Sequence, residues 1–198
     1  MKNDNLLTEG NVFRVLLKFS VPFLIANIIQ ALYGAVDLMV IGWYCAPESV
    51  AAVSTGTQVT QIITSMVSGL TLGSTIMVGK YTGMKDEDRT RKTIGTTLSV
   101  FAVIAILLTI VMLTFKGPIL AALKTPAASL KEANDYVTIC FYGIFFICGY
   151  NAISAVLRGY GDSRRPMYFV ALSCVLNIIG DIMFVKYLGL GVAGTALA

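Results

Sequence analysis

Long apolar runs dominate this chain and decide the kind of fold that it can adopt. Five of them match the roughly 20 residues that an α-helix needs to cross a bilayer. The chain is 56% hydrophobic and only 13% charged, whereas a soluble domain carries about 25% charged residues. The sequence therefore predicts an all-α bundle of membrane-spanning helices. The runs cover residues 19–42, 50–78, 94–115, 136–157 and 166–187.

The predicted helices extend a little beyond these runs, and a sixth begins near the end of the chain. This last helix starts near Leu190 and reaches only Ala198. We therefore expect residues 1–198 to form one transmembrane lobe, the first five to six helices of a longer protein. The predicted helices span about 12–42, 49–79, 93–116, 130–157, 165–187 and 190 onward.

Basic residues are distributed unevenly between two sets of connections. Of the 15 Lys and Arg residues, four lie on the side of the first–second, third–fourth and fifth–sixth connections. The rest lie on the other side, in the N-terminal segment and in the second–third and fourth–fifth connections. Because Lys and Arg accumulate on the cytoplasmic side of a membrane, the N-terminus is predicted to be cytoplasmic. The net charge of +4 follows from this bias, and we expect no nucleic-acid partner. The other set is Lys2, Arg14, Lys18, Lys80, Lys85, Arg89, Arg91, Lys92, Arg158, Arg164 and Arg165.

Residue types exclude some kinds of chemistry. The chain contains no histidine, which removes His-dependent catalytic triads and the usual zinc sites. Cys45, Cys140, Cys148 and Cys174 show no metal-ligand spacing and are interpreted as small buried hydrophobic residues. We therefore predict no enzyme activity, no catalytic residue and no cofactor apart from a transported ion.

Two carboxylates, Asp37 and Asp181, interrupt the apolar runs. A charged side chain in the bilayer core costs roughly 2.5–3.5 kcal/mol on insertion scales, so it needs a partner or a water-filled cavity. At 1.5 Å per residue, Asp37 lies about 7–8 Å and Asp181 about 9 Å below the same outer face. Thr195 of the sixth helix falls about 7–8 Å below that face as well. This shared depth predicts an ion or proton site.

Amide and hydroxyl side chains recur on one face of several predicted helices. Hydrogen bonds between helices would be enough to explain serines and threonines at these positions. Amide and acid side chains cost more to bury, so for them we predict a polar cavity. Gly69 and Gly73, like Gly79 and Gly83, have the spacing that permits close helix packing. The polar faces are Asn27, Gln30, Tyr33, Gly34 and Asp37; Gln58, Gln61, Ser65 and Ser68; Asn151, Ser154 and Arg158; and Asn177 with Asp181.

Several short stretches occur in a distinctive order and spacing over almost the whole chain. They are Pro22 with Gln30-Ala-Leu-Tyr33 and Asp37-Leu-Met-Val-Ile-Gly42, then Leu157-Arg-Gly-Tyr-Gly161 with Pro166, then Asn177-Ile-Ile-Gly-Asp181, and last Gly191-Val-Ala-Gly-Thr195-Ala196. Together they resemble the multidrug and toxic-compound extrusion (MATE) antiporters. The resemblance implies a multi-pass transporter of twelve helices in two lobes, in a bacterial or archaeal cytoplasmic membrane, of which this chain is the N-terminal lobe.

The resemblance also implies roles for individual residues and partners. Asp37, Asn177, Asp181 and Thr195 would bind the coupling cation, and Gln30, Tyr33 and Asn151 would belong to the adjoining network and cavity lining. Organic and often cationic compounds would be exported by a monomer in contact with membrane lipid, with the C-terminal lobe in the same full-length chain. Carboxylate, amide and hydroxyl oxygens suit a hard cation such as sodium, whereas a proton needs only one carboxylate, so both ions stay open.

Three other interpretations remain open at this point. A lipid-linked oligosaccharide flippase of related architecture would need several cationic residues for pyrophosphate, and only Arg158 is a candidate. An intramembrane aspartyl enzyme would need Asp37 and Asp181 in direct contact around a water molecule. A passive channel would be expected to present its acids as a symmetric ring. Cation-coupled antiport fits these residues best.

Overall fold

The computed structural model of the chain confirms the predicted all-α membrane bundle. It describes residues 11–198, apart from the side chain of Tyr33, and no β-strand occurs in that part. Three long helices come first: α1 (Val12–Tyr44), α2 (Pro47–Gly83) and α3 (Glu87–Ala122). They are followed by α4 (Leu130–Tyr142), α5 (Ile144–Gly159), α6 (Arg164–Asp181), the π-helical segment η1 (Ile182–Tyr187) and α7 (Gly191–Leu197).

Four of these segments are long and apolar enough to cross a membrane, namely α1, α2, α3 and α6 together with η1. The predicted fourth helix, 130–157, differs from the expectation of one regular helix. It consists of α4 and α5, which meet at Gly143 with a bend of 44°. A Cβ atom on Gly143 would lie 3.1 Å from the Cys140 carbonyl oxygen, so this tight bend favours a residue without a side chain.

The ends of α2 and α3 also extend beyond the predicted 49–79 and 93–116. At the start of α3 the reason is local capping: the Asp86 side chain accepts a hydrogen bond from the Arg89 N–H at 3.0 Å and starts the helix in a polar segment. Hydrophobicity marks only the part of a helix that lies in lipid, so it misses such polar turns.

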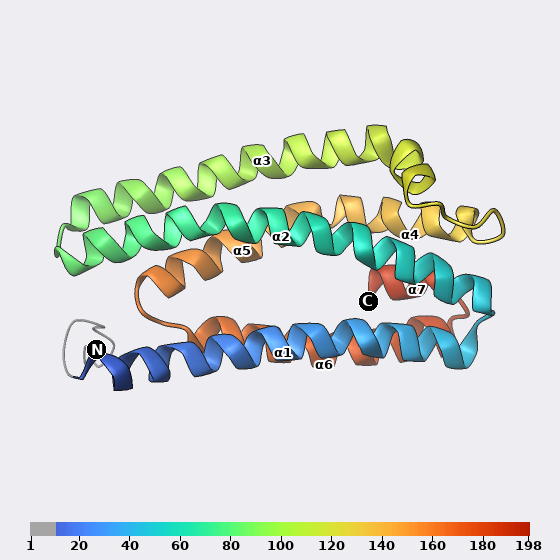
Figure 1. Cartoon of the computed structure of the whole chain (residues 1–198), viewed down its shortest axis with the longest axis horizontal. Coiled ribbons are helices and arrows are strands. Elements are labelled where there is room, and N and C mark those ends of the chain that lie inside the picture. Colours follow the sequence, from blue (N-terminus) through green and yellow to red (C-terminus); the bar gives the residue numbers. More distant parts are fainter. Residues whose placement is uncertain (1–10) are drawn as a thin grey trace.

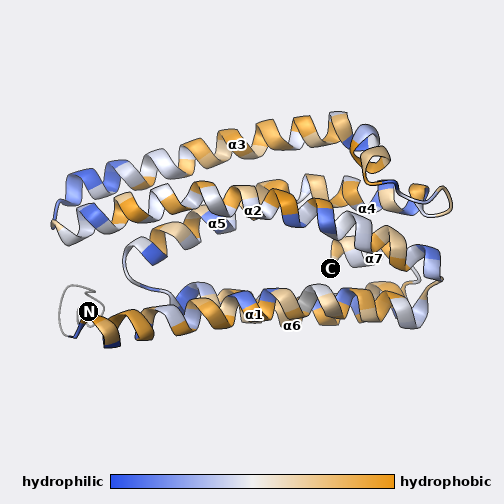
Figure 2. Cartoon of the chain, in the orientation of Figure 1, coloured by the Kyte–Doolittle hydropathy of each residue, from blue (hydrophilic) through white to orange (hydrophobic). Residues whose placement is uncertain are grey.

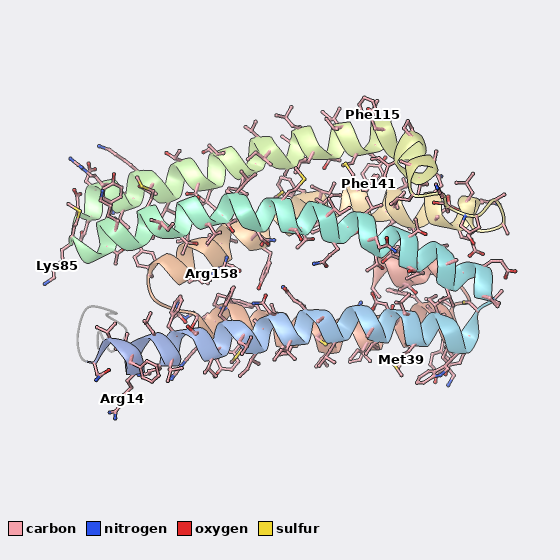
Figure 3. All side chains as sticks on the ribbon, viewed as in Figure 1. Arg14, Met39, Lys85, Phe115, Phe141 and Arg158 are labelled. Atoms are coloured by element: carbon pink, nitrogen blue, oxygen red, sulfur yellow. The ribbon has the colours of Figure 1, made fainter. Side chains whose placement is uncertain are left out.

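The helices form two groups that face each other (Figure 1). In one group α1 lies along α6, and in the other α2, α4 and α5 pack together with α3, which contacts all three of them. The α2–α3 and α5–α6 connections lie at the left end of Figure 1, beside the start of α1. Arg14, Lys85 and Arg158 all lie toward this left end (Figure 3). The α1–α2, α3–α4 and η1–α7 connections lie at the right end.

Hydropathy follows this arrangement. Most of α3 is hydrophobic, and its left end beside the α2–α3 turn is hydrophilic (Figure 2). Many of the most deeply buried apolar side chains, such as Val53, Val137 and Ile144, come from α2, α4 and α5, and Ile41 of α1 and Leu120 of α3 are buried with them. Large apolar residues such as Ile76 and Phe146 are instead exposed on the outside of the bundle, as expected for a surface in contact with lipid.

Of the four glycines whose spacing predicted close helix packing, one makes such a contact. Gly79 does approach α5, because a Cβ there would lie 3.3 Å from the Gly159 carbonyl oxygen. Gly69, Gly73 and Gly83 have no such neighbour within 4 Å in the described part of the chain. For these three glycines the predicted close packing is wrong within this lobe.

Candidate cation site

The packing of α1 against α6 brings Asp37 and Asp181 together. Asp37 is 6% exposed, seven residues before the end of α1, and Asp181 is fully buried as the last residue of α6. The Asp37 carboxyl interacts with the side chains of Asp181 and Asn177. Asn177 precedes Asp181 by one helical turn, so both reach the same face of α6. Two acids and one amide thus share one buried position.

Most oxygen atoms of this position have no hydrogen-bond partner among the described residues. This holds for Oδ1 of Asp37, Oδ1 of Asn177 and both carboxyl oxygens of Asp181. No Lys or Arg of the described residues lies within 4.0 Å of either acid to neutralise it. A buried polar atom without a partner typically costs about 1–3 kcal/mol, and a charged one costs more. The arrangement therefore favours the binding of a positive charge between the two acids.

The helix geometry changes directly after Asp181. Residues 182–187 form the π-helical segment η1, after which the Leu188 N–H bonds to the carbonyl oxygen of Met183, five residues earlier. Gly189 and Gly191 then adopt positive φ values of 63° and 52°, which glycine tolerates without steric cost. Short π-helical segments inside membrane helices often mark functional positions. Here the segment turns the chain back into the bundle as α7.

Thr195 is carried back toward α6 by α7. A Cβ on Gly194 would lie 3.0 Å from Cβ of Phe184, and a Cβ on Gly180 would lie 2.9 Å from Cβ of Ala198. These glycines therefore let α7 pack directly on the end of α6 and on η1. Thr195 is 4% exposed, and its Oγ1 is a further buried oxygen without a partner in the described part.

Of the three residues predicted to support the site, the structure describes the side chains of Asn151 and Gln30. Asn151 is buried between α5 and α2, where its Nδ2 donates to the Ile147 carbonyl oxygen at 2.8 Å and its Oδ1 accepts from Ser68 Oγ at 3.2 Å. It therefore stabilises the α2–α5 contact. Gln30 is exposed on α1. The Tyr33 side chain lies outside the described part of the molecule.

Sequence reasoning missed Cys140 of α4, which lies near Asp37, and its neighbour Tyr136. Cys140 is close enough to Asp37 to feel its charge, and it interacts with Thr60 and Tyr136. The Tyr136 hydroxyl lies 3.3 Å from Oγ1 of Thr57. Because Tyr136 and Cys140 are one turn apart, their shared helix face was a signal available in the sequence.

Comparison with known proteins identifies the family. A sequence model of the family described as MatE matches residues 22–183 of the chain. The chain belongs to the MATE family. The similarity to one curated relative, the "Probable multidrug resistance protein YoeA" of Bacillus subtilis, is 32% identity over 198 residues. It covers 96% of this chain and 42% of the relative, so the MATE chain described here spans less than half of the relative's length.

Solved MATE structures show the same arrangement of helices. The crystal structure of MATE in the bent conformation has a TM-score of 0.92 at 27% identity, covering 100% of this chain and 44% of that one. A multidrug resistance MATE family transporter in the outward-facing conformation has a TM-score of 0.90 at 27% identity, covering 100% of this chain and 43% of that one. The chain is therefore an integral membrane protein of a multidrug efflux transporter family, with the fold of a MATE lobe.

Proposed function

We propose that the full-length protein is an antiporter that exports organic compounds across the cytoplasmic membrane in exchange for sodium ions or protons. In this proposal Asp37, Asn177, Asp181 and Thr195 bind the coupling cation. The observation that carries it is the group of buried oxygen atoms without partners on these four residues. Their burial is costly without a ligand, and a cation is the ligand that matches their charge.

The donor set suits a transported ion better than a permanently bound metal. Among the described residues, no group of three or more His, Cys, Asp and Glu side chains is placed to hold a metal ion. Two carboxylates, one amide oxygen and one hydroxyl are oxygen ligands of the kind that hard cations prefer. A proton would be held by one of the two carboxylates alone. Either ion supplies the missing positive charge.

Coupling follows from the position of the acids on two different helices. Without a cation, the two carboxylates repel each other across the α1–α6 contact. With a cation bound, the same contact is favourable, so the cation and the exported compound can favour different helix arrangements. A ligand shifts such an equilibrium only through its differential affinity for the two states. The protein therefore needs no covalent step, and we assign it no enzymatic reaction.

Exposed polar side chains on α1 and α2 support an aqueous substrate cavity. Asn27 and Gln30 on α1, like Gln58 and Gln61 on α2, are exposed although they lie inside apolar spans. Amides facing lipid are unfavourable, so these faces are expected to line water or a further part of the protein. The multidrug names of the similar proteins favour organic compounds as the substrates.

The test is transport by the purified full-length protein in liposomes. A fluorescent organic cation such as ethidium is loaded on one side, and a sodium or proton gradient is imposed in the opposite direction. We expect the gradient of one ion to drive ethidium against its own concentration difference, and collapse of that gradient with an ionophore to stop transport. Ethidium movement that is equally fast with no gradient would contradict antiport and favour a passive channel.

A further inference from the structure

Glu132 is a third acid with an oxygen that lacks a partner. It lies in the first turn of α4, and its Oε2 is buried without a hydrogen-bond partner in the described part of the chain. None of the ion pairs there involves Glu132. The first turn of α4 follows the α3–α4 connection, which lies at the right end of Figure 1, the end at which α1 also finishes.

Helix capping does not explain this glutamate. Ser129 precedes α4 and stands three residues before Glu132, which is the spacing of a capping box. In that motif the glutamate accepts the backbone N–H of the capping serine. Here the Ser129 N–H donates to the Pro126 carbonyl oxygen at 3.0 Å, and the Ser129 side chain makes no capping bond. The position of the acid therefore needs another reason.

The surroundings of Glu132 connect α4 with two other elements of the right end. Its charge reaches the Cys45 thiol, which directly follows α1. A Cβ on Gly191, the first residue of α7, would lie 4.0 Å from the same sulfur atom. Glu132 therefore lies beside the end of α1 and the start of α7, the two helices that carry Asp37 and Thr195.

A row of polar side chains leads inward from this position. Glu132, Tyr136 and Cys140 follow each other at steps of four, so they share one face of α4. At 1.5 Å per residue the row is about 12 Å long. Its inner end is Cys140, which interacts with Tyr136 and feels the charge of Asp37. The face thus joins the outer end of the bundle to the acid pair.

We propose that Glu132 is the outer access site of the coupling cation: it attracts the ion from the external solution and passes it along this face of α4 to Asp37 and Asp181. The inference rests on the proposed function, because it needs a coupling cation. A carboxylate in a partly buried position raises the local concentration of cations and their rate of arrival. The Glu132 carboxylate supplies oxygen ligands of the kind that hard cations prefer.

The experiment measures how the rate of transport by the full-length protein in liposomes depends on the external cation concentration. Sodium chloride is varied in one titration, and external pH is varied in a separate titration for the proton. We expect Glu132→Gln to raise the half-saturating cation concentration by roughly 3- to 10-fold and to leave the maximal rate at saturating cation nearly unchanged. The matched control is Asp135→Asn, an exposed acid on the same turn of α4, which should behave like wild type. Glu132→Asp keeps the charge and should also remain close to wild type.

Two results would overturn the role of Glu132 while leaving antiport intact. One is a half-saturating concentration in Glu132→Gln that equals that of Asp135→Asn. The other is a lower maximal rate with unchanged cation dependence, which would indicate a structural role. If the glutamine variant does not fold, Glu132→Met supplies an uncharged side chain of similar length for the same comparison. Wild-type protein without any cation-driven transport would instead overturn the proposed function, and this inference with it.

Discussion

Gly159 of α5 lies directly against Val78 of α2. A Cβ atom on Gly159 would stand 2.6 Å from Cβ of Val78 and 3.0 Å from the Thr75 carbonyl oxygen, so no larger residue fits without moving one helix. The same region holds a hydrogen bond from Thr75 Oγ1 to the Ala155 carbonyl oxygen at 3.2 Å. In lipid, the hydrophobic effect does not drive helices together, so helix pairs depend on such close contacts for their stability. This explains the glycine of the Leu157-Arg-Gly-Tyr-Gly161 stretch by packing.

We therefore expect Gly159→Ala to lower the free energy of unfolding by about 1–3 kcal/mol, the usual cost of overpacking. Thermal unfolding of the purified protein in detergent measures the effect. The control is Gly149→Ala in the same helix, because a Cβ at that position has no neighbour within 4 Å. Equal melting temperatures for the two variants would contradict the close contact between α5 and α2.

Lys124 occupies a backbone conformation that suits glycine. Its φ is 53°, and the turn after α3 is closed by hydrogen bonds from Lys124 N–H to Ala121 and from Thr125 N–H to Leu120. Non-glycine residues are disfavoured in this left-handed region. Lys124→Gly should raise the free energy of unfolding by about 0.5–1 kcal/mol. Arg91→Gly, at an exposed position inside α3, should lower the free energy of unfolding by a similar amount. An opposite order of the two variants in chemical unfolding would disprove the explanation.

The depth of the two acids could be predicted by counting residues, whereas their neighbours could be predicted only from the family resemblance. A helix rises by a fixed distance per residue, so counting from the end of an apolar run places Asp37 and Asp181 in one layer. Which faces meet depends on the pairing of α1 with α6, which no local pattern encodes. The structure brings Asp37, Asn177 and Asp181 together, and their role in binding a cation stays a prediction.

Asn151 and Cys140 show the limit of residue-type arguments. The resemblance implies that Asn151 belongs to the network beside the cation site, which stays a prediction, and its amide bonds to Ser68 and the Ile147 carbonyl oxygen. Cys140 was interpreted as a small hydrophobic residue, yet it lies near Asp37. Cys140 on α4 and Asn151 on α5 lie on opposite sides of the 44° bend at Gly143. Hydrophobicity alone does not reveal such a bend.

Orientation in the membrane is a separate prediction, motivated by the basic residues at the left end of the bundle. We expect a single cysteine at Glu87, beside the α2–α3 turn, to resist an impermeant maleimide added to intact cells. A single cysteine at Ala127, in the α3–α4 connection, should react readily. Both positions are exposed, and the four native cysteines are replaced in the background protein. The reverse labelling pattern would place the N-terminus outside.

The acid pair gives the most direct test of coupling. In the full-length protein, we expect Asp37→Asn and Asp181→Asn each to abolish cation-driven efflux, because an amide keeps the size of the side chain but not its charge. Interactions of a charged group are worth about 1.5–3 kcal/mol, so cation affinity should fall by roughly 10- to 100-fold. Folding should be unchanged or slightly improved, since each variant removes an uncompensated buried charge.

Drug accumulation in cells and gradient-driven uptake in vesicles measure this loss, and melting temperatures in detergent check the fold. Asp88→Asn is the matched control, because this acid is exposed and pairs with Lys92 at the start of α3. It should leave transport unchanged. Binding of the drug to the static protein should survive in both acid variants, since the two sites are linked only through conformation. Normal gradient-driven transport by a well-expressed Asp37→Asn or Asp181→Asn protein would remove that acid from the coupling mechanism.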